Sequence, residues 1–155
     1  MKIKTIAAIV TALLLMTHIR PVCVARAQEV SAASAIVMET TTHRVLYEKN
    51  ADAQMSMAST TKIMTALLAV ESGLWDREIT ITAEMLKTEG SSIYLKEGDV
   101  LTLEALVLGL MLESGNDAAL SIAVALAGSE ASFAEQMNQR AAEIGMTDTH
   151  FVTSS

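Results

Sequence analysis

The sequence has little cysteine, histidine or basic charge, and each shortage excludes a class of site. Its 155 residues contain one cysteine, Cys23, and three histidines, His18, His43 and His150. A single cysteine can form neither a disulfide framework nor a cysteine-based metal site. The three histidines do not have the spacing of metal ligands, so the sequence predicts no metal. The length is that of a single domain.

The first residues have the pattern of a secretory signal peptide. Two lysines precede an apolar run from Ile6 to Met16, and Ala25-Arg26-Ala27 places small residues before Gln28. A positive start, an apolar stretch and a small-residue cleavage site are the three parts of such a peptide. The alternative is a membrane anchor, but the run is about half of the roughly 20 residues that span a bilayer. We therefore predict a signal peptide over residues 1–27.

Removal of residues 1–27 makes the chain strongly acidic. Four basic side chains leave and no acidic one does, so the formal charge changes from −7 to −11. The sequence therefore predicts no nucleic-acid binding, which depends on clustered lysine and arginine. Cys23 leaves as well, and Arg20-Pro21-Val22 before it is not the small apolar stretch of a lipoprotein signal. We expect an extracytoplasmic protein of the periplasm, the cell wall or the outer face of the cytoplasmic membrane.

The remaining chain, residues 28–155, begins with a strand pattern and continues with helical ones. Apolar residues on both sides of the polar turn at Thr41-Thr42-His43 predict a β-hairpin over residues 34–47. Helices are predicted over residues 59–72, ended by Gly73, then over 102–112 and 118–127, and from about Ser132 to Ile144, with a short strand at 79–81. A hairpin followed by helices indicates an α+β chain.

The apolar helix, the last helix and the hairpin each carry one further expectation. Residues 101–112 are apolar on nearly every side, so we expect this helix to be buried all round. Ser132 and Glu135 have the spacing of a capping box, which would start the last helix at Ser132. Two strands alone are marginal in water, so we expect the remaining strands of the hairpin's sheet to lie beyond residue 155.

Ser59-Thr60-Thr61-Lys62 is an S-x-x-K sequence at the start of a predicted helix. Residues i and i+3 share a helix face, so the Lys62 amine can reach the Ser59 hydroxyl. A serine becomes a good nucleophile when a neutral amine accepts its proton. The alternative is that Ser59 starts the helix and Lys62 is a solvated surface charge. A lysine in the first helical turn opposes the helix dipole, which slightly favours the catalytic interpretation.

Ser114-Gly115-Asn116 supplies a second hydroxyl and an amide between two predicted helices. The hydroxyl could transfer a proton to a leaving amine, and the amide could orient Lys62 or a substrate carbonyl. The alternative is an ordinary turn that also caps the following helix. S-x-x-K followed by an S-D-N-type sequence is typical of penicillin-binding proteins and class A β-lactamases.

The surrounding sequence resembles the serine D-alanyl-D-alanine carboxypeptidases, low-molecular-weight penicillin-binding proteins of peptidase family S11. The resemblance covers residues 33–152. It is carried by residues 45–52, 58–68, 90–92, 95–99, 112–119, 145–147 and 149–151, which include Ala58-Ser59-Thr60-Thr61-Lys62, Gly90-Ser91-Ser92 and Leu112-Glu113-Ser114-Gly115-Asn116-Asp117. It implies a β-lactamase/transpeptidase-like fold, present here as the hairpin and the helical subdomain without the remaining sheet strands.

The resemblance also implies a reaction and a role for each site residue. Ser59 would attack the D-Ala-D-Ala bond of a peptidoglycan stem peptide and form an acyl-enzyme, and Lys62 would accept its proton. Ser114 would assist proton transfer to the leaving D-alanine, and Asn116 would position substrate and Lys62. β-Lactam antibiotics would acylate Ser59, and no cofactor is implied. The resemblance leaves open a peripheral membrane association through a C-terminal segment beyond residue 155.

The chain departs from the family after Phe151, where it reads Val152-Thr153-Ser154-Ser155 and has no K-T-G sequence. K-T-G contributes a cation and part of the oxyanion hole, and losing one oxyanion donor typically costs about 10²–10³ in rate. We expect residues 28–155 alone to lack much of the burial of Lys62 and to release D-alanine slowly or not at all. Two alternatives are a non-catalytic truncated paralogue that acts as a binding module of the cell envelope, and a β-lactamase-related protein. Ser-Gly-Asn in place of S-D-N disfavours the latter.

Overall fold

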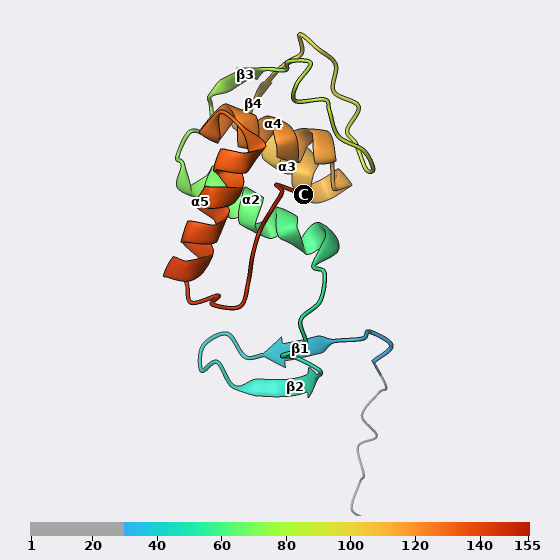
Figure 1. The fold of residues 1–155 in the computed structure, drawn as a ribbon, viewed down its shortest axis with the longest axis vertical. Coiled ribbons are helices and arrows are strands. Elements are labelled where there is room, and N and C mark those ends of the chain that lie inside the picture. The colour runs from blue at the N-terminus through green and yellow to red at the C-terminus, as the bar shows by residue number, and fades with distance from the viewer. Residues whose placement is uncertain (1–29) are drawn as a thin grey trace, which may run out of the picture. The chain divides into compact units, whose positions relative to one another are not determined.

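The computed structural model describes residues 30–155, which form two compact units (Figure 1). One unit ends at Gln54 and the other is Met55–Ser155. The predicted signal peptide, residues 1–27, lies outside the described residues and stays a prediction.

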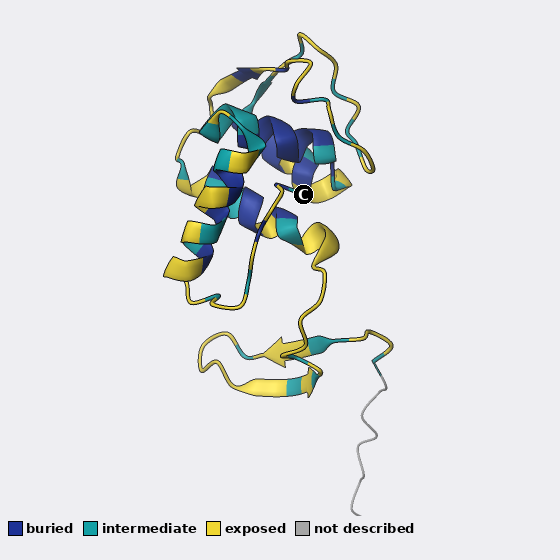
Figure 2. Cartoon of the chain, in the orientation of Figure 1, coloured by how far each residue is buried: buried dark blue, intermediate teal, exposed yellow. Residues whose placement is uncertain are grey.

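The first unit is the predicted hairpin. Strand β1 (Ala35–Met38) pairs antiparallel with β2 (Val45–Lys49), and the register shifts between Val37 and Met38. Within the described residues these two strands pair only with each other. None of residues 30–54 is buried, so the unit is teal and yellow throughout in Figure 2.

The hairpin turn is organised by one carboxylate. Glu39 accepts hydrogen bonds from the Thr42 hydroxyl and from the N–H groups of Thr41 (2.8 Å) and Thr42 (2.6 Å). These bonds, the Thr42 hydroxyl first, lower the pKa of Glu39 to about 2. The polar residues predicted at the turn therefore form it by donating to Glu39.

The second unit contains four α-helices and a short two-stranded sheet. Its elements are η1 (Ala58–Thr60), α2 (Thr61–Glu71), β3 (Glu78–Thr80), β4 (Val100–Thr102), α3 (Leu103–Glu113), α4 (Asn116–Ala127) and α5 (Glu130–Glu143). β3 and β4 are antiparallel, and β4 was not predicted from the sequence. Figure 2 shows the buried residues concentrated in α4 and on the inner sides of the other helices; they include Leu106, Leu110, Ile122, Phe133 and Met137. The predicted α+β class is confirmed.

Helix α3 is not buried all round, so that expectation was wrong. It packs against α2 and α4, which bury Leu106 and Leu110. Leu108, Met111 and Leu112 are 52%, 51% and 76% exposed. These three positions share one helix face at i, i+3 and i+4. Apolar composition identified the helix, but only the placement of its neighbours decides which sides they cover.

The predicted start of the last helix was also wrong. Helix α5 begins at Glu130 because Ser129, and not Ser132, is its N-cap: the Ser129 hydroxyl accepts from the Ser132 N–H at 3.1 Å. Gly128 ends α4 in a left-handed conformation (φ 81°), which leaves Ser129 extended and free to cap. Helix α4 begins at Asn116, two residues before the predicted start.

The residues after α5 return to α2 (Figure 1). Asn138 holds the buried Phe151 by accepting from its N–H (2.7 Å) and donating to its carbonyl (2.8 Å). The N–H and hydroxyl of Ser154 both donate to Glu130. The Thr65 hydroxyl donates to the Ser154 carbonyl at 2.6 Å. The chain end is thereby attached to α2 one turn after Lys62.

No single helix within residues 30–155 is long and apolar enough to cross a membrane. Helices α4 and α5 meet the length and composition criteria only as a pair, across a bend of 84°.

Candidate active site

The nucleophile predicted from the sequence, Ser59, lies at the entrance to α2. It is exposed and belongs to the single turn η1 that leads into the helix. Ala58 before it has a left-handed backbone (φ 45°). For a residue with a Cβ this conformation costs about 1–2 kcal/mol. Strained residues of this kind cluster at functional sites, where surrounding structure holds them in place.

Lys62 is one turn further along and is buried, with an exposed fraction of 4%. Its ammonium donates to the Ser114 carbonyl at 2.6 Å and to the Ser114 hydroxyl at 2.9 Å. Burial lowers the pKa of Lys62 below its ordinary value of 10.5, because the charged form is poorly solvated there. The expectation that residues 28–155 alone would lack much of the burial of Lys62 was wrong, since Lys62 is almost fully buried among them.

Ser114, the third predicted catalytic residue, connects the other two. It ends α3 in the left-handed conformation (φ 56°, ψ 34°), a second strained backbone at the site. Its hydroxyl accepts from Lys62 and donates to the Ser59 hydroxyl at 3.1 Å. Ser59, Ser114 and Lys62 therefore form one continuous hydrogen-bonded chain across 55 residues of sequence.

This chain of hydrogen bonds can carry a proton in either direction. With Lys62 charged, the proton of each donor points from Lys62 toward Ser59. Hydroxyl hydrogens rotate freely, so a neutral Lys62 can accept from Ser114 while Ser114 accepts from Ser59. The arrangement can therefore remove the proton of Ser59 through Ser114, which is what an activated serine nucleophile requires.

Comparison with known proteins identifies the family to which this arrangement belongs. The family model described as D-alanyl-D-alanine carboxypeptidase, peptidase S11, matches residues 22–155. The chain belongs to this family.

Individual S11 relatives agree. The chain is 37% identical to D-alanyl-D-alanine carboxypeptidase DacF of Bacillus subtilis over 126 residues, which are 77% of this chain and 32% of the relative. It is 38% identical to DacC of Escherichia coli, over 82% of this chain and 34% of the relative. The crystal structure of DacD from Francisella tularensis superimposes with a TM-score of 0.79 at 35% identity, covering 88% of this chain and 34% of that one. The chain thus spans about a third of the length of these relatives.

In this S11 chain the predicted substrate-binding residue, Asn116, has a different set of partners from those expected. Its side-chain amide donates to the Glu89 carbonyl at 2.5 Å and its main-chain N–H donates to the Ser91 carbonyl at 2.7 Å. Among the described residues, the hydrogen bonds of Lys62 go to Ser114 and none goes to Asn116. Asn116 therefore connects the Ser-Gly-Asn loop to the β3–β4 connection, and its role toward substrate stays a prediction.

One residue of the S11 site was given no role from the sequence. Asp117, directly after the Ser-Gly-Asn loop, is 3% exposed and accepts hydrogen bonds from residues 92–95. Its position at the start of α4 indicates a helix cap, but the sequence carries no sign of the partners 22–25 residues upstream.

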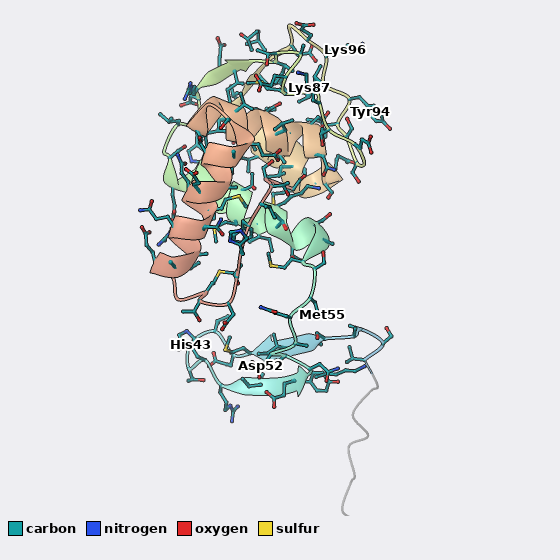
Figure 3. All side chains as sticks on the ribbon, in the orientation of Figure 1. His43, Asp52, Met55, Lys87, Tyr94 and Lys96 are labelled. Carbon is teal, nitrogen blue, oxygen red and sulfur yellow. The ribbon has the colours of Figure 1, made fainter. Side chains whose placement is uncertain are left out.

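Three further aromatic or imidazole side chains, those of Trp75, Tyr94 and His150, lie in the core or at the surface. Trp75 packs partly buried against the core, and His150 is exposed. Tyr94 is 84% exposed on the outer side of the β3–β4 connection (Figure 3). Residues 30–155 contain no group of His, Cys, Asp and Glu side chains that could hold a metal ion.

Proposed function

We propose that the protein containing this chain is a serine-type D-Ala-D-Ala carboxypeptidase that acts on peptidoglycan stem peptides outside the cytoplasm. The hydrogen-bonded chain from Lys62 through Ser114 to Ser59 in a member of the S11 family carries this proposal. Because the chain spans only part of its relatives, the activity is proposed for the protein in which these residues occur. The predicted signal peptide supports the extracytoplasmic location.

The reaction begins with acylation. The Ser59 oxygen attacks the carbonyl carbon of the penultimate D-alanine while its proton moves through Ser114 to neutral Lys62. The C–N bond to the terminal D-alanine breaks, and the proton returns through Ser114 to the leaving amine. The positive end of the α2 helix dipole favours negative charge that develops near Ser59.

Deacylation uses the same groups, with water in place of Ser59 as the nucleophile. A water molecule gives its proton to Lys62, attacks the ester carbonyl and releases the shortened peptide, and Ser59 recovers its proton. A β-lactam resembles the substrate and opens on Ser59 to give a long-lived ester. The family's K-T-G sequence does not occur in these 155 residues, so they do not supply the cation that it contributes.

A labelling experiment tests the nucleophile. The protein is incubated with a fluorescent penicillin, denatured and separated by electrophoresis. We expect covalent label in the wild type and none in Ser59→Ala. Ser56→Ala is the matched control, because Ser56 is an exposed serine three residues earlier and should label normally. Equal labelling of Ser59→Ala and the wild type would contradict the proposal.

A substrate experiment tests the reaction class. A peptide ending in D-Ala-D-Ala should release D-alanine, whereas the same peptide ending in D-Ala-L-Ala should not. A non-catalytic binding module would retain the peptide without releasing D-alanine. A β-lactamase-related protein would hydrolyse penicillin with rapid turnover, whereas the proposed enzyme keeps it as a stable adduct.

The location is tested by sequencing the N-terminus of the protein recovered outside the cytoplasm. We expect the signal peptide to have been cleaved before Gln28. Recovery of the protein only from the cytoplasm, with residue 1 retained, would contradict it.

A further inference from the structure

The carboxylate of Asp117 joins the start of α4 to a distant part of the chain. One oxygen, Oδ2, accepts from the Ser92 hydroxyl at 2.6 Å and from the Leu95 N–H at 3.1 Å. The other, Oδ1, accepts from the N–H groups of Ile93 and Ala118, each at 3.0 Å. Three of these four donors belong to residues 92–95, in the connection between β3 and β4.

The carboxylate is buried and charged. Burial raises the pKa of Asp117, but the bonds from Ser92, Ile93, Leu95 and Ala118 together outweigh burial and lower it below its ordinary value. A buried carboxylate is tolerated only when its oxygens are satisfied, and here four donors satisfy them. The N-terminus of α4 favours the negative charge as well.

Close packing fixes the same two segments together. A Cβ at Gly109 would lie 2.6 Å from the Ile93 side chain. A Cβ at Gly115 would lie 3.0 Å from Ile93 and 2.9 Å from Asp117 Oδ1. Ile93 thus rests directly on the backbone of the last turn of α3 and of the Ser-Gly-Asn loop. Only residues without a side chain permit this approach.

The Ser-Gly-Asn loop is therefore held by two successive stretches of the β3–β4 connection. Asn116 bonds to the carbonyls of Glu89 and Ser91, and Asp117 bonds to residues 92–95. Ser114 in this loop has the strained left-handed backbone that directs its hydroxyl between Lys62 and Ser59. A strained conformation persists only where the surroundings determine it.

We infer that Asp117 is a positioning residue for this site: its carboxylate fixes residues 92–95 against the Ser-Gly-Asn loop and so holds the Ser114 hydroxyl between Lys62 and Ser59. This inference rests on the proposed function. Asp117 touches neither reacting atoms nor Lys62, so it acts through the geometry of Ser114. A misplacement of about 1 Å in such a site can reduce the rate about 10²-fold.

The test compares acylation by a fluorescent penicillin, under single-turnover conditions, in four variants and the wild type. Asp117→Asn keeps the size of the side chain but turns one acceptor into a donor facing the Leu95 N–H. Ser92→Ala removes one of the four hydrogen bonds. The double variant combines both changes. The matched control is Asp99→Asn, because Asp99 also accepts from a main-chain N–H (Lys96, 2.8 Å) in the same connection.

We expect Asp117→Asn to lower the acylation rate constant about 10- to 100-fold, with little change in the concentration of penicillin that gives half-maximal rate. Ser92→Ala should lower the rate less, and it should have no further effect in the Asp117→Asn background because both changes release the same contact. Asp99→Asn should acylate like the wild type. The pH midpoint of acylation should shift in Asp117→Asn, since Lys62 then meets a displaced Ser114.

All measurements are made at a temperature where circular dichroism shows each variant folded, so that a purely structural role would leave rate and pH midpoint unchanged. Acylation of folded Asp117→Asn at the wild-type rate and midpoint would overturn the inference. If Asp117→Asn does not fold, Ser92→Ala provides the test. A folded Ser92→Ala protein that acylates at the wild-type rate would overturn the inference, and a lowered rate would support it. Absence of label in the wild type would overturn the proposed function, and this inference with it.

Discussion

Replacement of Ser114 by alanine tests the proton path most sharply. Ser114→Ala removes the hydroxyl that accepts from Lys62 (2.9 Å) and donates to Ser59 (3.1 Å), while the main-chain carbonyl still accepts from Lys62 at 2.6 Å. Lys62 therefore keeps one partner and stays buried, and Ser59 loses its connection to the base. The change interrupts the path without removing either end of it.

The expected magnitude follows from the group removed. General acid–base catalysis contributes about 10²–10⁴-fold, so the acylation rate constant should fall by that factor. A hydrogen bond to a charged group contributes about 1.5–3 kcal/mol, so the free energy of unfolding should fall by up to about that amount. The pKa of Lys62 should fall further, since its charged form loses an acceptor.

Ser114→Gly is the matched comparison. It removes the same hydroxyl but relieves the left-handed backbone, which costs about 1–2 kcal/mol for a residue with a Cβ. The greater flexibility of glycine in the unfolded chain offsets about 0.5–1 kcal/mol of this gain. Ser114→Gly should therefore unfold at a higher denaturant concentration than Ser114→Ala and acylate equally slowly.

The assay is stopped-flow acylation by a chromogenic penicillin, paired with urea unfolding of each variant. Equal loss of acylation in both variants, with different stabilities, separates catalysis from folding. Wild-type acylation in Ser114→Ala would exclude the proton path through Ser114, because Lys62 would then act on Ser59 without the intervening hydroxyl.

Three further predictions concern charge and packing in the helical unit. Acylation requires neutral Lys62, so its rate should rise with pH through a midpoint below 10.5, which a pH–rate profile measures. Between that midpoint and pH 10.5 the free energy of unfolding should also rise with pH, because there the unfolded chain binds more protons than the folded protein. Gly109→Ala should lower the melting temperature, because overpacking against Ile93 costs about 1–3 kcal/mol, which exceeds the gain in helix propensity of about 1 kcal/mol. A raised melting temperature would contradict the packing of Gly109 against Ile93. Arg140→Ala removes the paired contacts with Glu71 between α5 and α2. Because this pair is exposed to solvent, the urea midpoint should fall only slightly, and by less at high salt; a large fall would contradict this.

Local pattern was enough to predict the main elements. The hairpin around residues 41–43 and α2 with Gly73 beyond its end follow from residues that are neighbours in sequence. The one-turn spacing of Ser59 and Lys62 likewise needs only the geometry of a helix. For these features the local sequence is sufficient for the prediction.

Features that depend on tertiary packing could not be predicted in this way. The start of α5 is an exception, because the left-handed Gly128 directly before Ser129 is a local feature that favours Ser129 over Ser132 as the cap. The pattern of α3 records apolar side chains but not which neighbours cover them. The partners of Asp117 lie in a connection without regular structure, so nothing in the spacing of the sequence connects them.

The contact between Ser114 and Lys62 could be predicted only in part. Their separation of 52 residues gives no local reason for contact. The family resemblance placed both in one site, and the structure adds how they meet: the Lys62 ammonium bonds to Ser114, and Ser114 bonds to Ser59. The burial of Lys62 was underestimated because Ser114, which contacts its ammonium, lies 52 residues later in the sequence.

In the proposed reaction Ser59 is the nucleophile, and Lys62 accepts its proton through Ser114. The most direct measurement is peptide mapping by mass spectrometry after acid-quenched reaction with a penicillin. We expect an adduct on the tryptic peptide 50–62, with fragment ions that place it on Ser59 and not on Ser56. An adduct on any other residue, or none in a folded protein, would contradict it.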